Sequence, residues 1–134
     1  MSFRQERIIL NTKAGISNID LTRQVQNIVK DSKIENGLCN ILCRHTTAGL
    51  ILNERDLMLV KDFERYIMNE IPDDKLYQHP SNGFSHLRSL FSRPEITIPI
   101  ANSELMLGQW QNIMLWEFDK EGREREVVVT LIGD

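Results

Sequence analysis

The sequence predicts an α+β domain with an antiparallel, β-sandwich-like core and two main helices, all in a single domain over residues 1–134. Segments with the two-residue period of strands bracket two segments with helical period, and extended segments dominate the last third of the chain. No Gly-rich phosphate loop interrupts this pattern. A chain of 134 residues with 41% hydrophobic and 26% charged residues is typical of a globular protein that buries its own core.

The first part of the chain predicts a strand, a helix and a second strand. Residues 3–12 alternate as a strand does, and residues 13–18 form a connection. Asp20 is a suitable N-cap for the helix that follows. The apolar face of this helix consists of Leu21, Val25, Ile28 and Val29. Gly37 marks the return to extended structure, and residues 38–43 form the next strand.

The middle of the chain predicts an amphipathic helix and a polar loop. The apolar face of the helix consists of Leu57, Val60, Phe63, Ile67 and Ile71. The helix must end before Pro72, because proline breaks the backbone hydrogen bonding of a helix. Residues 73–85 are polar and rich in turn-forming residues, which is typical of an exposed loop. A short helix is expected over residues 86–91.

The last third of the chain predicts antiparallel strands. A strand over residues 95–100 leads to a turn at residues 102–103 and then to a long extended segment over residues 105–118. Residues 119–122 predict a hairpin turn into a final strand over residues 123–132. Alternation along the long segment places Trp110, Asn112, Met114, Trp116 and Phe118 on one side.

Charge and composition exclude several classes of partner. A formal net charge of −3 and a pI of about 5.6 give no electrostatic footprint for nucleic acid. Residues 1–7 lack the apolar core of a signal peptide, and no apolar run is long enough to span a membrane. We therefore expect a cytoplasmic protein that binds neither nucleic acid nor membrane.

Two cysteines, Cys39 and Cys43, lie four residues apart on the strand expected over residues 38–43. That spacing separates their Cα atoms by about 13 Å, which is beyond the reach of a disulfide. It also differs from the tight pairs of zinc knuckles and redox motifs. We expect both thiols to be reduced and buried as small core residues.

Residues 44–54 form the strongest candidate for a functional site. His45, Thr46 and Thr47 follow directly after an apolar strand. A titratable imidazole and two hydroxyls at this point favour a site at the end of the strand, because an ordinary strand spreads its polar residues along the solvent face.

Asn53 and Glu54, at the end of the same segment, allow two interpretations. An amide beside a carboxylate at a strand-to-helix junction can bind a cation, orient a histidine or serve as a base. Alternatively, Asn53 caps a helix that opens near Arg55 and Asp56, with Glu54 favourable in its first turn. The sequence leaves both interpretations open.

All three histidines, His45, His79 and His86, lie in polar stretches. Three convergent imidazoles with an open position suit zinc or a similar divalent ion. On one helix, His79 and His86 would be about 10 Å apart along the axis, so the turn at residues 80–83 must bring them together. Single histidines also make ordinary hydrogen bonds, and this alternative stays open.

Two further stretches contain candidate ligand-binding residues. Trp110 and Gln111, close to Gly108, suit stacking on a heteroaromatic ring, whereas packing in a core or between subunits is the commoner role of such a tryptophan. Arg123 and Arg125 alternate onto one face and suit a phosphate group. The neighbouring acids that could equally neutralise them are Glu121, Glu124 and Glu126.

The order of these motifs resembles the YjbQ family, whose members are called secondary thiamine-phosphate synthase enzymes. The resemblance spans nearly the whole chain. It rests on His-Thr-Thr-Ala-Gly-Leu-Ile-Leu-Asn-Glu over residues 45–54, residues 77–79, Asn82 with His86, residues 105–111 and residues 117–118. The resemblance implies a compact α+β sandwich that assembles as a homotrimer, with the histidine motifs near the clefts between subunits.

The resemblance also implies a transferase that joins a hydroxymethylpyrimidine diphosphate to a thiazole phosphate and releases pyrophosphate. The implied catalytic residues are His45, Glu54 and His86. The implied metal ligands are His45, His79 and His86, with zinc or magnesium as the divalent cofactor. The implied substrate-binding residues are Thr46, Thr47, Asn53, Asn82, Trp110, Gln111, Arg123 and Arg125.

Two other functions fit the same residues. A metal-dependent hydrolase of a small phosphorylated metabolite would activate water among the histidines, with Glu54 as base. A non-enzymatic trimeric module would use the polar cluster only to bind a phosphorylated metabolite or a protein partner. Attack by water without a thiazole acceptor would distinguish the hydrolase from the transferase.

Overall fold

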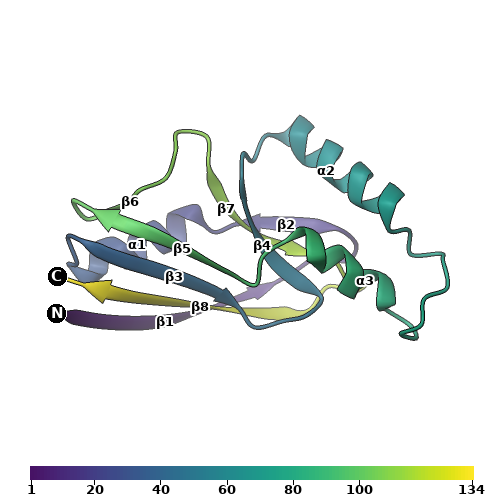
Figure 1. Ribbon diagram of the computed structural model, residues 1–134, viewed down its shortest axis with the longest axis horizontal. Coiled ribbons are helices and arrows are strands. Elements are labelled where there is room, and N and C mark those ends of the chain that lie inside the picture. The colour runs from purple at the N-terminus through teal and green to yellow at the C-terminus, as the bar shows by residue number, and fades with distance from the viewer.

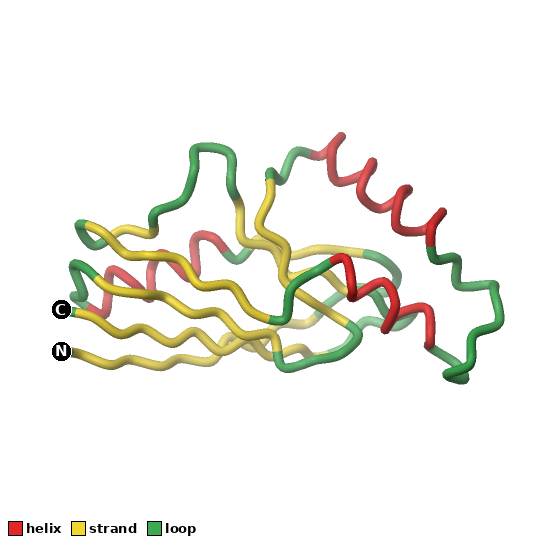
Figure 2. The backbone as a smooth tube through the Cα atoms, viewed as in Figure 1, coloured by secondary structure: helices red, strands yellow, loops and turns green.

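The computed structural model describes residues 1–134 and shows two antiparallel sheets with helices around them (Figures 1 and 2). Sheet A has the strand order β1-β8-β3-β5-β6, and sheet B has the order β2-β7-β4. The strands of sheet A are β1 (Ser2–Asn11), β3 (Gly37–Cys43), β5 (Glu95–Ala101), β6 (Glu104–Leu105) and β8 (Glu124–Gly133). Those of sheet B are β2 (Ser17–Asp20), β4 (Ala48–Asn53) and β7 (Asn112–Glu117). The predicted α+β class is confirmed.

Three helices and one 3₁₀ helix complete the fold: α1 (Thr22–Ser32), α2 (Leu57–Glu70), α3 (Gly83–Arg88) and η1 (Ser89–Phe91). The short helix predicted over residues 86–91 thus begins earlier, at Gly83, and continues as η1. None of the helices combines the length and apolar character needed to cross a membrane.

The main core lies between the two sheets and α1. Alternation along β8 buries Val127, Val129 and Leu131. They pack in one cluster with the predicted apolar face of α1, Leu21, Val25, Ile28 and Val29. Burying an apolar side chain of this size contributes about 1.5–3 kcal/mol, so this alternation is a strong determinant of which face of sheet A is internal. Cys39 and Cys43 belong to the same cluster as free, buried thiols, as predicted.

The hairpin predicted at residues 119–122 is wrong. β7 lies in the middle of sheet B, whereas β8 lies in sheet A between β1 and β3. Between β7 and β8 the chain passes from sheet B to sheet A, and the first residues of this connection lie in the interior. Phe118 and Asp119 are both buried, and the Phe118 N–H donates to the Thr47 carbonyl over 3.1 Å.

Two other strand predictions need correction. Residues 17 and 18, expected as the end of a connection, and Asp20, expected as an N-cap, belong to the short edge strand β2, which pairs with β7. The extended segment predicted over residues 105–118 is interrupted between β6 and β7. A turn lies there, because the Gln111 N–H donates to the Gly108 carbonyl over 3.1 Å.

The helix N-termini also differ from the prediction. α1 begins at Thr22, whose N–H donates to the Asp20 carboxylate over 3.0 Å, although Asp20 precedes the N-cap position. α2 has Asp56 at its N-cap. Asn53 instead accepts the N–H of Glu54 over 2.8 Å. The capping interpretation of Asn53 is therefore wrong.

α2 packs through one face on a second, smaller apolar cluster. Its buried residues Val60 and Ile67 contact Met114, Trp116 and Phe118. Leu57, predicted on the same face, is 73% exposed, because the first turn of α2 lies away from the sheets (Figure 1). α2 is therefore a peripheral helix rather than a central core element.

Candidate functional site

The connection between β3 and β4 borders a cavity of about 340 Å³. The cavity is lined by His45, Thr46, Ala48, His86, Ser89, Leu90, Ser92 and Pro94. Three of the predicted site residues, His45, Thr46 and His86, thus come together from two distant parts of the chain. The two imidazoles and the Thr46 hydroxyl are the groups that can bind a hydrogen-bonding ligand here, because the Ser89 and Ser92 hydroxyls donate to the backbone carbonyls of His86 and Ser89.

His45 has a defined protonation state in the wall of this cavity. Its Nε2 atom accepts the backbone N–H of Glu126 over 2.8 Å. Because a backbone N–H only donates, Nε2 carries no proton, and the neutral ring has its proton on Nδ1. Burial, together with the positive charge of Arg125, lowers the pKa of His45 below its ordinary value of 6.5. Near neutral pH the imidazole is therefore uncharged and has Nδ1–H available to a ligand.

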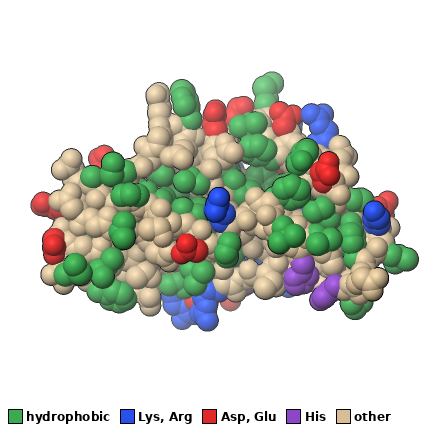
Figure 3. Space-filling view, viewed as in Figure 1, with side chains coloured by type: hydrophobic (Ala, Val, Ile, Leu, Met, Phe, Trp, Pro, Cys, Tyr) green, Lys and Arg blue, Asp and Glu red, His purple; other side chains and the backbone are tan.

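His79 and His86 lie beside each other, with ring centroids 4.7 Å apart. Figure 3 shows two histidine side chains next to one another on the surface. The turn at residues 80–83 brings these rings together, as the sequence required. Nδ1 of His79 donates to the Pro80 carbonyl over 3.0 Å. His79 lines a separate cavity of about 380 Å³ within its own loop, and only His86 shares a cavity with His45.

A three-histidine metal site is not supported within one chain. No three His, Cys, Asp or Glu side chains are grouped so that they could hold a metal ion. The hydrogen bond from Glu126 explains why His45 does not fit, since it places the remaining proton on the one nitrogen, Nδ1, that could reach a ligand. Within one chain, His45, His79 and His86 are therefore not arranged as the ligands of a single zinc or magnesium ion.

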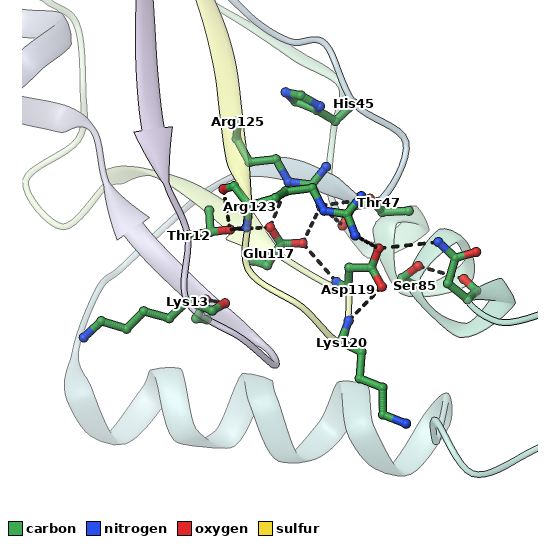
Figure 4. A network of polar contacts seen from close by, with 12 residues as sticks. Thr12, Lys13, His45, Thr47, Ser85, Glu117, Asp119, Lys120, Arg123 and Arg125 are labelled. Carbon is green, nitrogen blue, oxygen red and sulfur yellow. Dashed lines mark hydrogen bonds and ion pairs between the residues drawn. The ribbon is translucent and has the colours of Figure 1, made fainter.

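A buried ion pair between Arg125 and Glu117 contacts Thr47, the neighbour of the cavity residue Thr46 (Figure 4). Arg125, at 2% exposure, donates from Nε to Glu117 over 2.8 Å and also from Nη2 to Glu117, which is fully buried. Nη2 of Arg125 further donates to the Thr47 hydroxyl over 2.8 Å and to the Thr47 carbonyl over 3.3 Å. Thr47, predicted to bind substrate, is thus turned into the protein and bonded there.

A second ion pair, between Arg123 and Asp119, extends this network toward α3. The buried Asp119 carboxylate accepts from Arg123 over 2.5 Å, from the Lys120 N–H over 2.7 Å and from the Asn82 amide over 3.4 Å. Asn82, predicted to bind substrate, instead precedes α3 and accepts the Ser85 hydroxyl at its carbonyl over 2.7 Å. The network therefore joins β7, β8 and the start of α3.

These contacts correct the prediction for the two arginines. Arg123 and Arg125 are each neutralised by a buried acid, so neither has its full charge available for a phosphate. The partners are Glu117 and Asp119 rather than the predicted Glu121, Glu124 and Glu126. Glu126 pairs instead with Arg7 and Arg44.

Other predicted site residues lie apart from the cavity. Asn53 is the last residue of β4, about 17 Å along the strand from Ala48, and Glu54 follows it. Trp110 is 65% exposed in the loop between β6 and β7, so the core-packing interpretation of this residue is wrong. The Gln111 side chain accepts the Gly108 N–H over 2.8 Å in the same loop. One chain does not bring these residues to His45 and His86.

Glu117 and Asp119 were missed as candidates by the sequence reasoning. The signal was present, because two acids at the end of the apolar run from Ile113 to Phe118 resemble the polar residues that follow β3. The hairpin interpretation obscured Asp119, since a turn is expected to be polar and exposed, and Glu117 was assigned only to one side of the extended segment over residues 105–118.

The chain is similar to proteins from bacteria and archaea. The family described as UPF0047 protein YjbQ-like matches residues 6–134. The UPF0047 protein sll1880 of Synechocystis is 33% identical over 140 residues, covering 99% of this chain and 95% of that protein. A UPF0047 protein of Methanothermobacter thermautotrophicus is 32% identical over 136 residues, covering 99% and 94%.

The chain is also similar to proteins of solved structure. A YbjQ-like protein of unknown function from Sulfolobus solfataricus superposes with a TM-score of 0.94 at 31% identity, covering 99% of both chains. A yjbq/upf0047 family protein from Clostridium acetobutylicum gives 0.89 at 32% identity, covering 95% of this chain and 99% of that one. With its motif order, its fold and these relatives in agreement, the chain belongs to the UPF0047 YjbQ-like family.

Proposed function

We propose that the protein is a transferase that joins a hydroxymethylpyrimidine diphosphate to a thiazole phosphate at the cavity between His45 and His86. The products are thiamine phosphate and pyrophosphate. The observation that carries the proposal is the neutral His45 ring, whose Nδ1–H is a donor of fixed direction in a polar cavity. The motif resemblance supplies the identity of the two substrates.

The chemistry needs donors rather than a proton acceptor. The bond between the pyrimidine methylene carbon and the pyrophosphate oxygen breaks, and pyrophosphate leaves with the electron pair. The thiazole nitrogen then donates its lone pair to that carbon and forms the new C–N bond. Negative charge grows on the leaving oxygen, so preorganised N–H and O–H donors lower the barrier. Nδ1 of His45 and the hydroxyl of Thr46 fit this role, and His86, which lines the same cavity, is a further candidate.

We propose further that the complete site requires a homotrimer. Glu54, Trp110 and Gln111 lie away from the cavity within one chain, so only another copy can bring them to it. Large apolar side chains that are exposed on α2, α3 and η1 support association: Leu57, Met58, Tyr66, Leu87, Leu90 and Phe91. Contiguous exposed apolar surface is typical of an interface.

Sedimentation equilibrium tests the assembly. We expect one species of about three times the 15.6 kDa chain mass. Leu57→Lys with Met58→Lys should shift the protein to monomers and abolish turnover. A monomeric wild-type protein with full turnover would contradict the trimer.

A coupled assay tests the activity. Purified protein is mixed with the two thiamine precursors, with and without magnesium chloride, and both pyrophosphate and thiamine phosphate are measured. We expect His45→Gln and His86→Ala each to reduce kcat by about 10²–10³-fold, the usual effect of removing one preorganised donor. Asn27→Ala, on the exposed face of α1, is the control and should retain activity.

The same assay separates the alternatives. Pyrophosphate release without the thiazole acceptor, and without thiamine phosphate, would favour a hydrolase. Thermal stabilisation by either precursor without any product would favour a binding module. Unchanged turnover in both histidine variants would contradict the transferase site.

A further inference from the structure

We propose that Glu117, which does not line the cavity, is a positioning residue that holds His45 in place through Arg125 and Thr47. The inference deepens the proposed function and rests on it for its activity measurements only. It assigns a role to a buried ion pair that has no place in the chemistry itself.

Glu117 has no acceptor capacity left for a ligand. Its two oxygens accept from Nε and Nη2 of Arg125, from the Thr12 hydroxyl over 2.6 Å and from the Asp119 N–H over 3.0 Å. An ionised carboxylate offers about four acceptor positions, and all are filled by donors of the chain. Glu117 therefore binds groups of the protein itself and not a substrate.

The segment 45–47 is fixed at both ends by two adjacent residues of β8. The Arg125 side chain bonds Thr47, and the Glu126 backbone N–H bonds Nε2 of His45. The Thr47 carbonyl also accepts the N–H of Phe118 from the end of β7. Glu117 orients Arg125 by two parallel hydrogen bonds, so the orientation of the guanidinium, and with it the place of His45, depends on Glu117.

Stability alone does not account for such a pair. Replacing a buried ion pair by apolar residues of similar volume is often neutral or stabilising, because two charges no longer have to be desolvated. The pair does have an effect at the site. After burial itself, the charge of Arg125 is the largest influence on the His45 imidazole and lowers its pKa, whereas the charge of Glu117 raises it by a smaller amount. Positioning is the role that these contacts support.

Paired variants separate positioning from folding. Glu117→Leu with Arg125→Met removes both charges together and leaves no buried charge unpaired, so we expect it to fold. Arg125→Lys keeps the positive charge but loses the planar fork that reaches Glu117 and Thr47 at once. Glu6→Gln with Arg4→Met removes an ion pair from β1, away from the site, and is the control.

The main measurement is the tautomer of His45, read by long-range ¹H–¹⁵N NMR of the ring at pH 7.5. We expect the wild type and the control to show the Nδ1–H form. The double variant and Arg125→Lys should show a mixture with the Nε2–H form, because the segment 45–47 is no longer fixed. A pure Nδ1–H form in both would overturn the proposal, whatever the protein catalyses.

The activity measurement gives an independent result. Where the wild type makes thiamine phosphate, kcat should fall on the order of 10–100-fold in the double variant, with a smaller change in KM. Full kcat in a folded double variant would also overturn the positioning role. If the wild type shows no turnover, the proposed function fails while the NMR result still decides this inference.

Discussion

The backbone N–H of Glu126 and the Nε2 atom of His45 are 2.8 Å apart, and this hydrogen bond links the protonation of His45 to folding. Protonating Nε2 would break the bond and place a charge beside Arg125. The folded state therefore resists protonation of His45 more than the unfolded state does, in agreement with the lowered pKa.

The pH dependence of stability follows from this. With the folded pKa below the ordinary value of 6.5, the unfolded state binds more protons as the pH falls past that value. The contribution of His45 to the free energy of unfolding is thus fully present above pH 6.5 and is lost as the pH falls through the folded pKa. Urea unfolding between pH 5 and pH 8 measures it. His45→Gln, which keeps an acceptor for the Glu126 N–H, should show a shallower loss, and parallel curves for both proteins would contradict the assignment.

Removing only the arginine of the buried Arg125–Glu117 pair should strongly lower the free energy of unfolding. Arg125→Met leaves the Glu117 carboxylate buried without its cation, and such a change typically destabilises by about 3–5 kcal/mol. Equilibrium urea unfolding at pH 7.5 gives the value. Arg7→Met, which removes an exposed partner of Glu126, is the matched control and should change stability little. If the two substitutions lowered the free energy of unfolding equally, burial of the Arg125–Glu117 pair would not explain the effect of Arg125→Met.

The cysteines should be unreactive while the protein is folded. Burial raises the pKa of Cys39 to about 12 and also raises the pKa of Cys43. The reactive thiolate is therefore scarce at pH 8, and both sulfurs are shielded from reagents. Titration with a chromogenic disulfide should detect no fast thiol in native protein and two thiols in guanidinium chloride. A rapid reaction of even one thiol without denaturant would contradict this.

Gly37 should not tolerate alanine. β3 and β8 approach so closely at this point that a Cβ on Gly37 would lie 2.2 Å from the Ile132 carbonyl oxygen. The strands would have to separate, and overpacking of this kind costs about 1–3 kcal/mol or more. Gly108→Ala is the control, since its Cβ would come no closer than 3.3 Å, to the flexible side chain of Gln111. Thermal unfolding should show a lower Tm for Gly37→Ala and almost none of this loss for Gly108→Ala.

The spacing of apolar residues predicted those elements whose buried face can be identified from their own sequence. Alternation at Val127, Val129 and Leu131 indicated the inner face of β8, and helical spacing indicated α1. β2 was missed because Asn18 and Asp20 have low strand propensity, and only pairing with β7 makes this segment extended. Leu57 was misplaced because periodicity shows an apolar face without showing where the neighbouring sheet ends.

The candidate site was partly predictable, because some of its residues stand out in the local sequence pattern. His45 and Thr46 stood out because polar residues at the end of an apolar strand are unusual, and His86 belonged to the same motif order. The pairing of Arg125 with Glu117 was not predictable, since it depends on β7 and β8 lying in different sheets. A sequence pattern that predicts strands does not show which strands become neighbours.

The position of β8 determines the order in which the sheet can form. β8 is the last strand of the chain, yet it lies between β1 and β3 and pairs with both (Figure 1). During synthesis, β1 and β3 have no partner along these edges until residues 124–133 leave the ribosome. Contacts of such long sequence separation slow folding and leave strand edges open to pairing with other chains. The facing edges of β1 and β3 can therefore pair with other chains until β8 has inserted between them.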